Sequence, residues 1–402
     1  MAEKRSRFIL YSGILLLAFV LLDPFNIVPD RGARRPGVDT ERATAMAQHL
    51  EVIHRSPEDY LLDMLEEHRV VLLGTIGRIR EHTEFVSHMV EAIPLADVHT
   101  LGVDFVRADD QDVLDRLVDG PEFDRRTAAD LLLRRDVLSG FEDYVDILES
   151  VWEYNSARGD GTEALRVIAL SQQFFYDEIE TEADMNDPET MRSVIREGPP
   201  DTFMAERVLN TIVEDDRRAL VFMRLPHALS GFSPSSVEEE MADLGFEGIE
   251  PTGVQLRNAI DEEVATILLH SPWPDSSRMQ GMTFAADGYI EAVLDLVPEG
   301  MSRMGFSPGQ DPVGSLGVQS SQFGDPDNPR AFHDITDGYI ILERSSDLSA
   351  SRLIPDFYTA DNIAFARQNF PGPEDTSMDE QSLQEFVRGI VQAYDRNLQE
   401  FQ

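Results

Sequence analysis

Short apolar runs that alternate with amphipathic stretches constrain the fold of this chain more than any other feature. Each run is closed by a turn or a polar residue, and most are rich in Val, Ile and Leu, as expected for strands buried on both faces of a sheet. Alternation of this kind is typical of parallel βαβ units. The sequence therefore predicts an α/β fold with a mainly parallel sheet flanked by helices, with strands at residues 69–73, 98–105, 165–170, 219–225, 264–269 and 339–342.

Amphipathic patterns between and after these runs predict the flanking helices. Apolar residues recur at helical spacing in 83–93, 109–118, 135–154, 202–212 and 379–398. Clusters of Gly, Pro, Ser and Asp break the pattern from about 272 to 330. Because structureless segments of this length are uncommon in a compact domain and usually functional, we expect a long irregular insertion or lid there.

The charge balance is strongly acidic and limits the partners of the chain. Asp and Glu number 75 against 34 Lys and Arg, which gives a formal net charge of −41. Such a surface repels nucleic acid, so we expect no nucleic-acid partner. Lys4 is the only lysine, for which a halophilic source and a GC-rich genome that prefers Arg codons are equally good explanations. The absence of cysteine removes disulfides, thiolate metal sites and a cysteine nucleophile.

The N-terminal segment has the pattern of a membrane anchor. Basic residues at positions 4, 5 and 7 precede an apolar stretch at 8–22, whose length lies between that of a signal-peptide core and that of a spanning helix. No small-x-small cleavage pattern follows directly, which favours an uncleaved anchor over a signal peptide. Since basic residues stay inside, we expect a single-pass membrane protein whose main domain is extracytoplasmic. The predicted parts are a cytoplasmic basic tail (1–7), an anchor or signal segment (8–28), a linker (29–40) and the α/β domain (41–402).

Polar residues follow the predicted strands where a ligand site is expected, because ligands bind at the carboxyl ends of the strands in an open parallel sheet. Asp104 lies near the end of the second run, with Arg107 close behind. His227 follows the fourth run and His270 follows the fifth. Their convergence would form an acid/base or anion-recognition site. The alternatives are that Asp104 caps the following helix and that His227 only closes its strand.

A second set of candidates follows the first predicted strand. Arg78 is suited to binding an anionic group, although pairing with surface carboxylates is the commoner role of such an arginine. His82 and His88 lie six residues apart, so the i, i+4 zinc pair of metalloproteases is absent and no metal-ligand set is predicted. No Walker, dinucleotide-binding or Gly-x-Ser-x-Gly motif is present either.

Three segments between about residues 65 and 230 follow the order of a known superfamily. They are 70–74 with 81–85, then 101–105 with 111–115, and finally 201–205 with 219–223 and 226–228. In this order the chain resembles the superfamily of erythromycin-esterase-like proteins, ChaN-type haem-binding uptake lipoproteins and Tiki/TraB proteins. It departs from the family's Gly-Glu-x-His signature, since Thr75 and Gly77 occupy the positions of the Glu and the His. Asp104 also replaces the family's usual Glu.

The resemblance first implies a membrane-anchored, extracytoplasmic ligand-binding domain related to haem-uptake proteins. Loss of the signature Glu and His favours binding over catalysis. A small-molecule or haem ligand is then expected, with haem or a divalent metal as the cofactors the family suggests. Arg78, Arg107 and His270 are the candidate cofactor-binding residues.

Two further hypotheses remain open. In the first, the chain is a hydrolase in which His227 acts as general base and Asp104 orients it or a metal, while Arg78 or Arg107 holds the anionic transition state. Glu81 and His82 would then substitute for the missing Glu and His of the signature. In the second, the chain is a non-catalytic interaction protein of the cell envelope.

Overall fold

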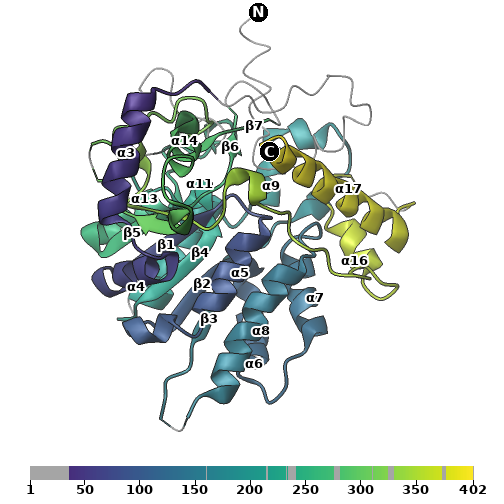
Figure 1. The fold of residues 1–402 in the computed structure, drawn as a ribbon. Coiled ribbons are helices and arrows are strands. Elements are labelled where there is room, and N and C mark those ends of the chain that lie inside the picture. The colour runs from purple at the N-terminus through teal and green to yellow at the C-terminus, as the bar shows by residue number, and fades with distance from the viewer. Residues whose placement is uncertain are drawn as a thin grey trace, which may run out of the picture.

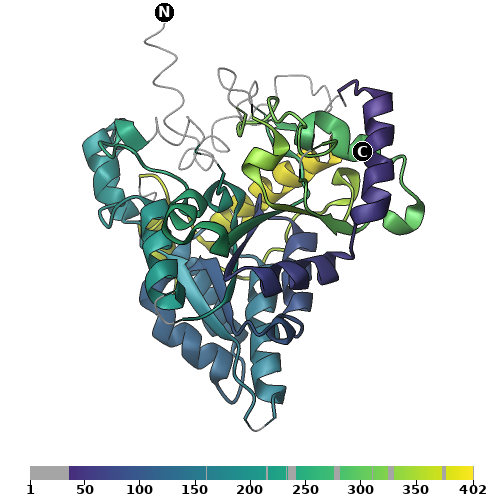
Figure 2. The same ribbon diagram turned by 90° about the vertical axis from the view of Figure 1, so that its left-hand side faces the viewer.

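A seven-stranded sheet with helices on both faces forms the centre of the computed structural model of this chain (Figure 1, Figure 2). The structure describes residues 36–159, 161–213, 216–231, 233, 241–275, 281–309, 311–324, 330–373 and 377–401. Within these ranges, no helix is both long enough and apolar enough to cross a membrane. The predicted anchor at 8–28 lies outside the described residues.

The sheet has the order β3-β2-β4-β1-β5-β9-β8. All neighbouring strands are parallel except the edge pair of β8 and β9, which is antiparallel. Every predicted run forms a strand, so the α/β class and the mainly parallel sheet are confirmed. The strands of this sheet are β1 (Val70–Thr75), β2 (Thr100–Arg107), β3 (Arg166–Ser171), β4 (Ala219–Arg224), β5 (Val264–Leu269), β8 (Met304–Phe306) and β9 (Gly338–Ile341).

Both faces of the sheet are buried under helices. Successive side chains of a strand point to opposite sides, so each strand contributes to both cores. In β1, Val71 and Leu73 belong to the core of one face, while Val70 and Leu72 belong to the core of the other. The first core is covered by α4 (Pro57–Glu67), α5 (Arg80–Met89), α6 (Gln111–Asp119), α7 (Arg125–Arg135), α8 (Glu142–Ala157), α16 (Ile363–Gln368) and α17 (Glu380–Gln399). The second is covered by α10 (Pro200–Val208), α11 (Leu225–Ala228) and α13 (Thr252–Ile260). A separate small cluster of apolar residues includes α9 (Pro188–Val194).

The described parts of the segment from 272 to 330 contain more regular secondary structure than the predicted irregular insertion. It contributes β8 to the sheet and also contains α14 (Tyr289–Leu294) and a short hairpin of β6 (Trp273–Pro274) and β7 (Met282–Thr283). Its apolar side chains share a core with α3 (Thr40–Ile53) and α15 (Phe332–Ile335), and α3 and α14 lie side by side (Figure 1). These short elements were not predicted because Gly and Pro clusters interrupt the segment and each element has too few apolar residues to show a helical or strand periodicity.

The predicted helix at 135–154 is wrong in its first third. Helix α7 ends at Arg135 and α8 begins at Glu142, with a turn between them. Asp136 stabilises this turn, since its carboxylate accepts hydrogen bonds from the Leu138 amide and the Ser139 hydroxyl. A β-carbon on Gly140 would lie 2.5 Å from the Phe357 ring, so the chain packs too closely here for a larger residue. In the sequence, the buried apolar residues of this turn have the same spacing as apolar residues on one face of a helix.

Candidate functional site

The carboxyl ends of six parallel strands meet at one edge of the sheet, where the candidate residues were predicted to lie. Strand β4 lies between β2 and β1 in this sheet. Helix α11, which follows β4 and carries His227, is therefore flanked by β2 with Asp104 and by the end of β1 with Thr75. Parallel pairing thus brings together side chains that are more than 100 residues apart in sequence.

Asp104 joins the ends of three strands. Its Oδ2 atom accepts a hydrogen bond from the Arg224 backbone amide at 3.0 Å and lies 3.4 Å from the Arg224 Nε. Its carbonyl oxygen accepts hydrogen bonds from the Ser171 hydroxyl at 2.6 Å and from the Arg135 Nε at 3.2 Å. Asp104 is only 9% exposed. Its carboxylate therefore holds the end of β4 and pairs with an arginine, a role that neither predicted alternative included.

Two arginines at this edge are neighbours of like charge. Burial lowers the pKa of Arg135, and the positive charge of Arg224 lowers it further. Partial desolvation also disfavours the charged form of Arg224, but Asp104 and Asp136 outweigh this effect and raise its pKa. A bound anion would relieve the repulsion between the two guanidinium groups and form charge-assisted hydrogen bonds with them.

Arg78 and Tyr144 complete this group. Arg78 follows Gly77 in a turn where both residues have positive φ angles, and its guanidinium carbon lies 5.9 Å from the centre of the Phe141 ring. Burial and the nearby Asp104 carboxylate raise the pKa of Tyr144 to about 12, while Arg78 and Arg224 oppose that rise. Asp104, Arg78 and Arg224 thus lie close enough to Tyr144 to shift its pKa, and Arg135 lies next to Asp104 and Arg224. We call Arg78, Arg135 and Arg224, with Asp104 and Tyr144, the arginine cluster.

His227 is oriented by Asp201, which the sequence analysis did not include among the site residues. The His227 Nδ1 lies 2.9 Å from the Asp201 Oδ1, and their side chains are 16% and 12% exposed. The same oxygen accepts hydrogen bonds from the Thr252 amide at 2.8 Å and the Thr252 hydroxyl at 2.9 Å. Burial alone would raise the pKa of Asp201, but His227 and Thr252 lower it. The prediction that Asp104 orients His227 is therefore wrong, because Asp104 bonds to Arg224 instead.

An ionised Asp201 determines the tautomer of His227. A carboxylate accepts hydrogen bonds only, so the His227 Nδ1 carries the proton and its Nε2 is free to accept one. No residue within the described ranges is hydrogen bonded to this Nε2. The pair thus has the arrangement of a general base held by a carboxylate.

His82 and His270 lie in a buried hydrogen-bond chain rather than in the arginine cluster. The His82 Nδ1 lies 2.8 Å from the Thr75 hydroxyl, and its Nε2 lies 3.1 Å from the His270 carbonyl oxygen. His82 is 0% exposed, and burial lowers its pKa to about 3. The His270 ring bonds to the Tyr339 hydroxyl at 2.8 Å and to Glu291 at 3.0 Å. This geometry favours structural roles for both histidines, which were predicted to be catalytic (His82) and cofactor-binding (His270).

Two further predicted residues have partners within the protein. Glu81 accepts a hydrogen bond from the Ser349 amide at 3.0 Å. Arg107 lies 3.5 Å from the buried Asp110 carboxylate and 3.7 Å from Asp109, so its charge is already balanced. The catalytic role predicted for Glu81 and the cofactor-binding role predicted for Arg107 stay predictions, with no support from these contacts. In the part of the chain that the structure describes, no group of three or more His, Asp or Glu residues is arranged to hold a metal ion.

The residues that sequence reasoning missed are Asp201, Arg135, Arg224 and Tyr144. A signal existed for two of them. Arg224 is the last residue of its strand, and Asp201 begins one of the segments on which the family resemblance rests. Arg135 and Tyr144 had no such signal, since both belong to regular helical patterns and reach the edge of the sheet only in the folded chain.

Comparisons with known proteins support the fold. No protein-family model matches the chain, and no curated protein sequence matches it. A succinoglycan biosynthesis protein of known structure is similar, with a TM-score of 0.52 and 10% identity over 79% of this chain and 100% of that chain. A Bacillus cereus protein matches over the same shares with a TM-score of 0.50 and 12% identity.

An erythromycin esterase mutant in its open conformation also matches, with a TM-score of 0.47 and 12% identity over 74% of this chain and 95% of that chain. The two matches with TM-scores of 0.50 and 0.52 support the α/β fold alone. Identities this low carry no ligand or activity over to this chain.

Proposed function

We propose that this protein is a hydrolase that acts on a small anionic substrate at the carboxyl edge of its sheet. The observation that carries the proposal is the His227–Asp201 pair at 2.9 Å. The proposal keeps His227 in the role predicted from the sequence and gives the orienting role to Asp201.

The chemistry assigned to His227 follows from its hydrogen bonds. With Nδ1–H donated to Asp201, the Nε2 lone pair can take a proton from a water molecule that attacks the substrate. The imidazolium that forms is stabilised by the Asp201 carboxylate, which Thr252 holds in place through two hydrogen bonds. A step of this kind contributes a factor of about 10² to 10⁴ to the rate.

The arginine cluster accounts for the anionic character of the substrate. Arg224 lies three residues before His227, at the junction of β4 and α11. Its side chain is 47% exposed, so it can reach a ligand while it remains paired with Asp104. In a chain with net charge −41, a group of three guanidiniums is the feature best suited to attract and hold a carboxylate or a phosphate.

The test is turnover of 4-nitrophenyl esters with and without a carboxylate or phosphate group by the purified chain. We expect the anionic esters to be hydrolysed faster, and we expect His227→Ala to reduce kcat by about 10²-fold or more. Arg224→Gln should mainly raise KM for the anionic esters. Turnover that is unaffected by His227→Ala would exclude His227 as the base.

Binding of an anionic ligand without turnover is a second candidate function. The loss of the family's Gly-Glu-x-His and the neighbouring guanidiniums of Arg135 and Arg224 favour it, since guanidiniums fit the carboxylates of a ligand such as haem. Titration with haemin tests this candidate through a change in the absorption spectrum that Arg224→Gln weakens. A spectrum that stays that of free haemin would rule out haem, and esterase activity would then decide the function.

A further inference from the structure

A short segment at 349–354, which we call the strap, crosses the loop that carries Arg78. The strap runs antiparallel to this loop, with an isolated bridge between Ile79 and Ala350. The Ser351 amide donates a hydrogen bond to the Arg78 carbonyl oxygen at 2.9 Å, and the Arg80 amide donates to the Ser349 carbonyl oxygen at 3.0 Å. These bonds lie on both sides of Ile79, the residue that follows Arg78.

The other end of the strap is bound to the start of α8. The Glu142 amide donates a hydrogen bond to the Arg352 carbonyl oxygen at 2.8 Å, and the Ile354 amide donates to the Gly140 carbonyl oxygen at 2.9 Å. The strap therefore connects the start of α5, next to Arg78, with the start of α8, which carries Tyr144 of the arginine cluster.

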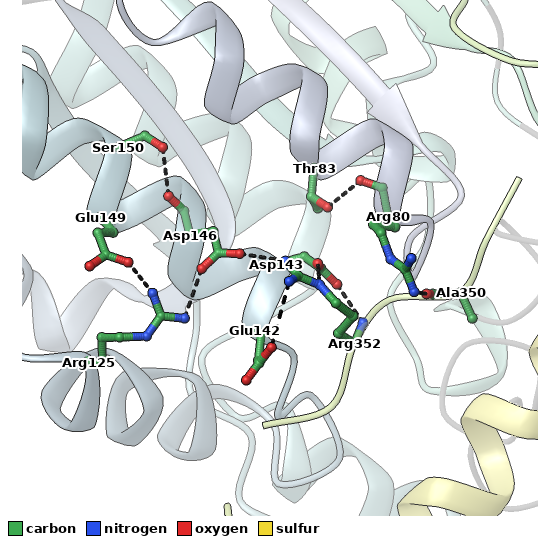
Figure 3. A network of polar contacts seen from close by, with 10 residues as sticks. All are labelled: Arg80, Thr83, Arg125, Glu142, Asp143, Asp146, Glu149, Ser150, Ala350 and Arg352. Carbon is green, nitrogen blue, oxygen red and sulfur yellow. Dashed lines mark hydrogen bonds and ion pairs between the residues drawn. The ribbon is translucent and has the colours of Figure 1, made fainter. Parts of the chain in front are cut away.

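Arg352 fastens the strap to α8 through a network of carboxylates (Figure 3). Its Nε lies 2.7 Å from the Asp143 Oδ1, and its backbone amide donates to the Asp143 Oδ2 at 2.6 Å. A second guanidinium nitrogen lies 2.6 Å from Asp146, which Arg125 also contacts at 2.8 Å (Figure 3). Asp143 is 1% exposed, so this pair is shielded from solvent better than an ordinary surface ion pair.

The loop under the strap has a backbone conformation that needs support. Gly77 has φ +82° and Arg78 has φ +58°, a region that residues other than glycine rarely adopt. Such conformations persist only where surrounding contacts hold them. Besides the strap, the Tyr394 hydroxyl of α17 donates a hydrogen bond to the Gly77 carbonyl oxygen at 3.1 Å.

We propose that Arg352 is a positioning residue for the arginine cluster: by fastening the strap to α8, it holds Arg78 in the left-handed conformation in which Arg78 faces the anion. The inference rests on the proposed function, since it needs Arg78 to bind the anionic group. Arg352 does not contact the substrate. Its effect passes through the Ser351–Arg78 and Arg80–Ser349 backbone bonds.

The experiment compares Arg352→Gln, Arg352→Lys and Arg78→Gln in the full chain, with inorganic phosphate as the binding probe. We expect Arg352→Gln to raise the Kd for phosphate and the KM for anionic esters by roughly tenfold, with kcat changed less than about twofold. Arg352→Lys keeps one charge and should recover part of the affinity. Hydrogen exchange of the Arg80 and Ser351 amides should become faster in Arg352→Gln.

Arg303→Gln is the matched control. Arg303 is 49% exposed and lies 3.5 and 3.6 Å from two carboxylates, while Arg352 is 42% exposed, but Arg303 has no link to the strap. The control should leave both Kd and exchange unchanged. If Arg352→Gln shows faster hydrogen exchange but an unchanged Kd for phosphate, while Arg78→Gln does raise this Kd, the positioning role is overturned and the proposed function is left intact. An unchanged Kd in Arg78→Gln would instead remove Arg78 from the proposed anion site, and the inference would fall with it.

Discussion

At the scale of single residues, Asp201 decides whether His227 can act as a base. Asp201→Asn replaces a charged acceptor with a neutral amide that no longer fixes the proton on Nδ1 or stabilises the imidazolium. We therefore expect kcat for anionic esters to fall by about 10²-fold or more, with little change in KM. Steady-state kinetics check this, and Asp187→Asn, which removes a carboxylate but keeps a capping side chain at an exposed helix start, is the control. An unchanged kcat would show that Asp201 only holds Thr252.

His82 should make the protein sensitive to acid. Its folded pKa of about 3 lies below its ordinary value of 6.5, because burial disfavours the charged ring. The unfolded chain therefore binds a proton that the folded chain does not, and stability that is complete above pH 6.5 is lost as the pH falls toward 3. The free energy of unfolding should drop by roughly 1.4 kcal/mol for each pH unit from this group alone.

Denaturant unfolding of the wild type and of His82→Gln across this pH range measures that contribution. The variant loses the titrating ring, so its stability should depend less steeply on pH. Equal slopes in the two proteins would mean that His82 does not remain neutral in the folded chain.

At the scale of secondary-structure elements, Gly74 determines how closely the helix that carries His227 approaches the sheet. A β-carbon at Gly74 would lie 2.7 Å from the Leu268 side chain, 3.1 Å from the Ala228 side chain and 3.4 Å from the Leu225 backbone. Leu225 and Ala228 are the ends of α11. Strand β1 and helix α11 can therefore pack against each other only without a side chain here.

Gly74→Ala should destabilise the protein by about 1–3 kcal/mol, the usual cost of overpacking a core. It should also lower esterase turnover, since α11 has to move away from β1 and takes His227 with it. Thermal unfolding and kinetics on the same preparation check both effects. Gly389→Ala in α17 is the matched control, because no atom lies within 4 Å of the added β-carbon. If Gly74→Ala is as stable and active as this control, the close approach of α11 is not required.

At the scale of the whole molecule, the net charge of −41 should make stability depend on salt. Raising the salt concentration from 0.1 M to 1 M shortens the screening length from about 10 Å to about 3 Å and weakens repulsion among the carboxylates. We expect Tm to rise by roughly 3–5 °C at neutral pH. Near the isoelectric point of about 4.4 the net charge is close to zero, so the increase should vanish there. A Tm that is independent of salt at neutral pH would contradict this account.

The predicted anchor at 8–28 also belongs to this scale, and we propose that it places the α/β domain outside the cytoplasm. Its support is the basic and apolar pattern of the N-terminal segment. Fractionation of cells that express the full chain, followed by protease treatment of intact cells stripped of their outer layers, tests it. Recovery of the chain in the soluble fraction would contradict the anchor, and protection from protease would contradict the orientation.

The sequence by itself determined the class of the fold and the positions of the buried strands. Runs such as 219–225 consist almost entirely of apolar residues, because both faces of such a strand must be buried. This composition can be recognised in the sequence without knowing the rest of the fold. The same local signal identified His227 as a residue just beyond a strand. This signal did not distinguish the turn at 136–141 from a helix, because buried apolar residues have the same spacing in both.

Only the tertiary structure decided which side chains meet. The partner of His227 proved to be Asp201 instead of Asp104, because β4 and the start of α10 are brought together by packing on one face of the sheet. The His82 ring is buried in the core, where it hydrogen bonds to the Thr75 hydroxyl and to the carbonyl oxygen of His270, the residue that follows β5. The energies of such contacts depend on distances of a few ångströms that no local pattern encodes.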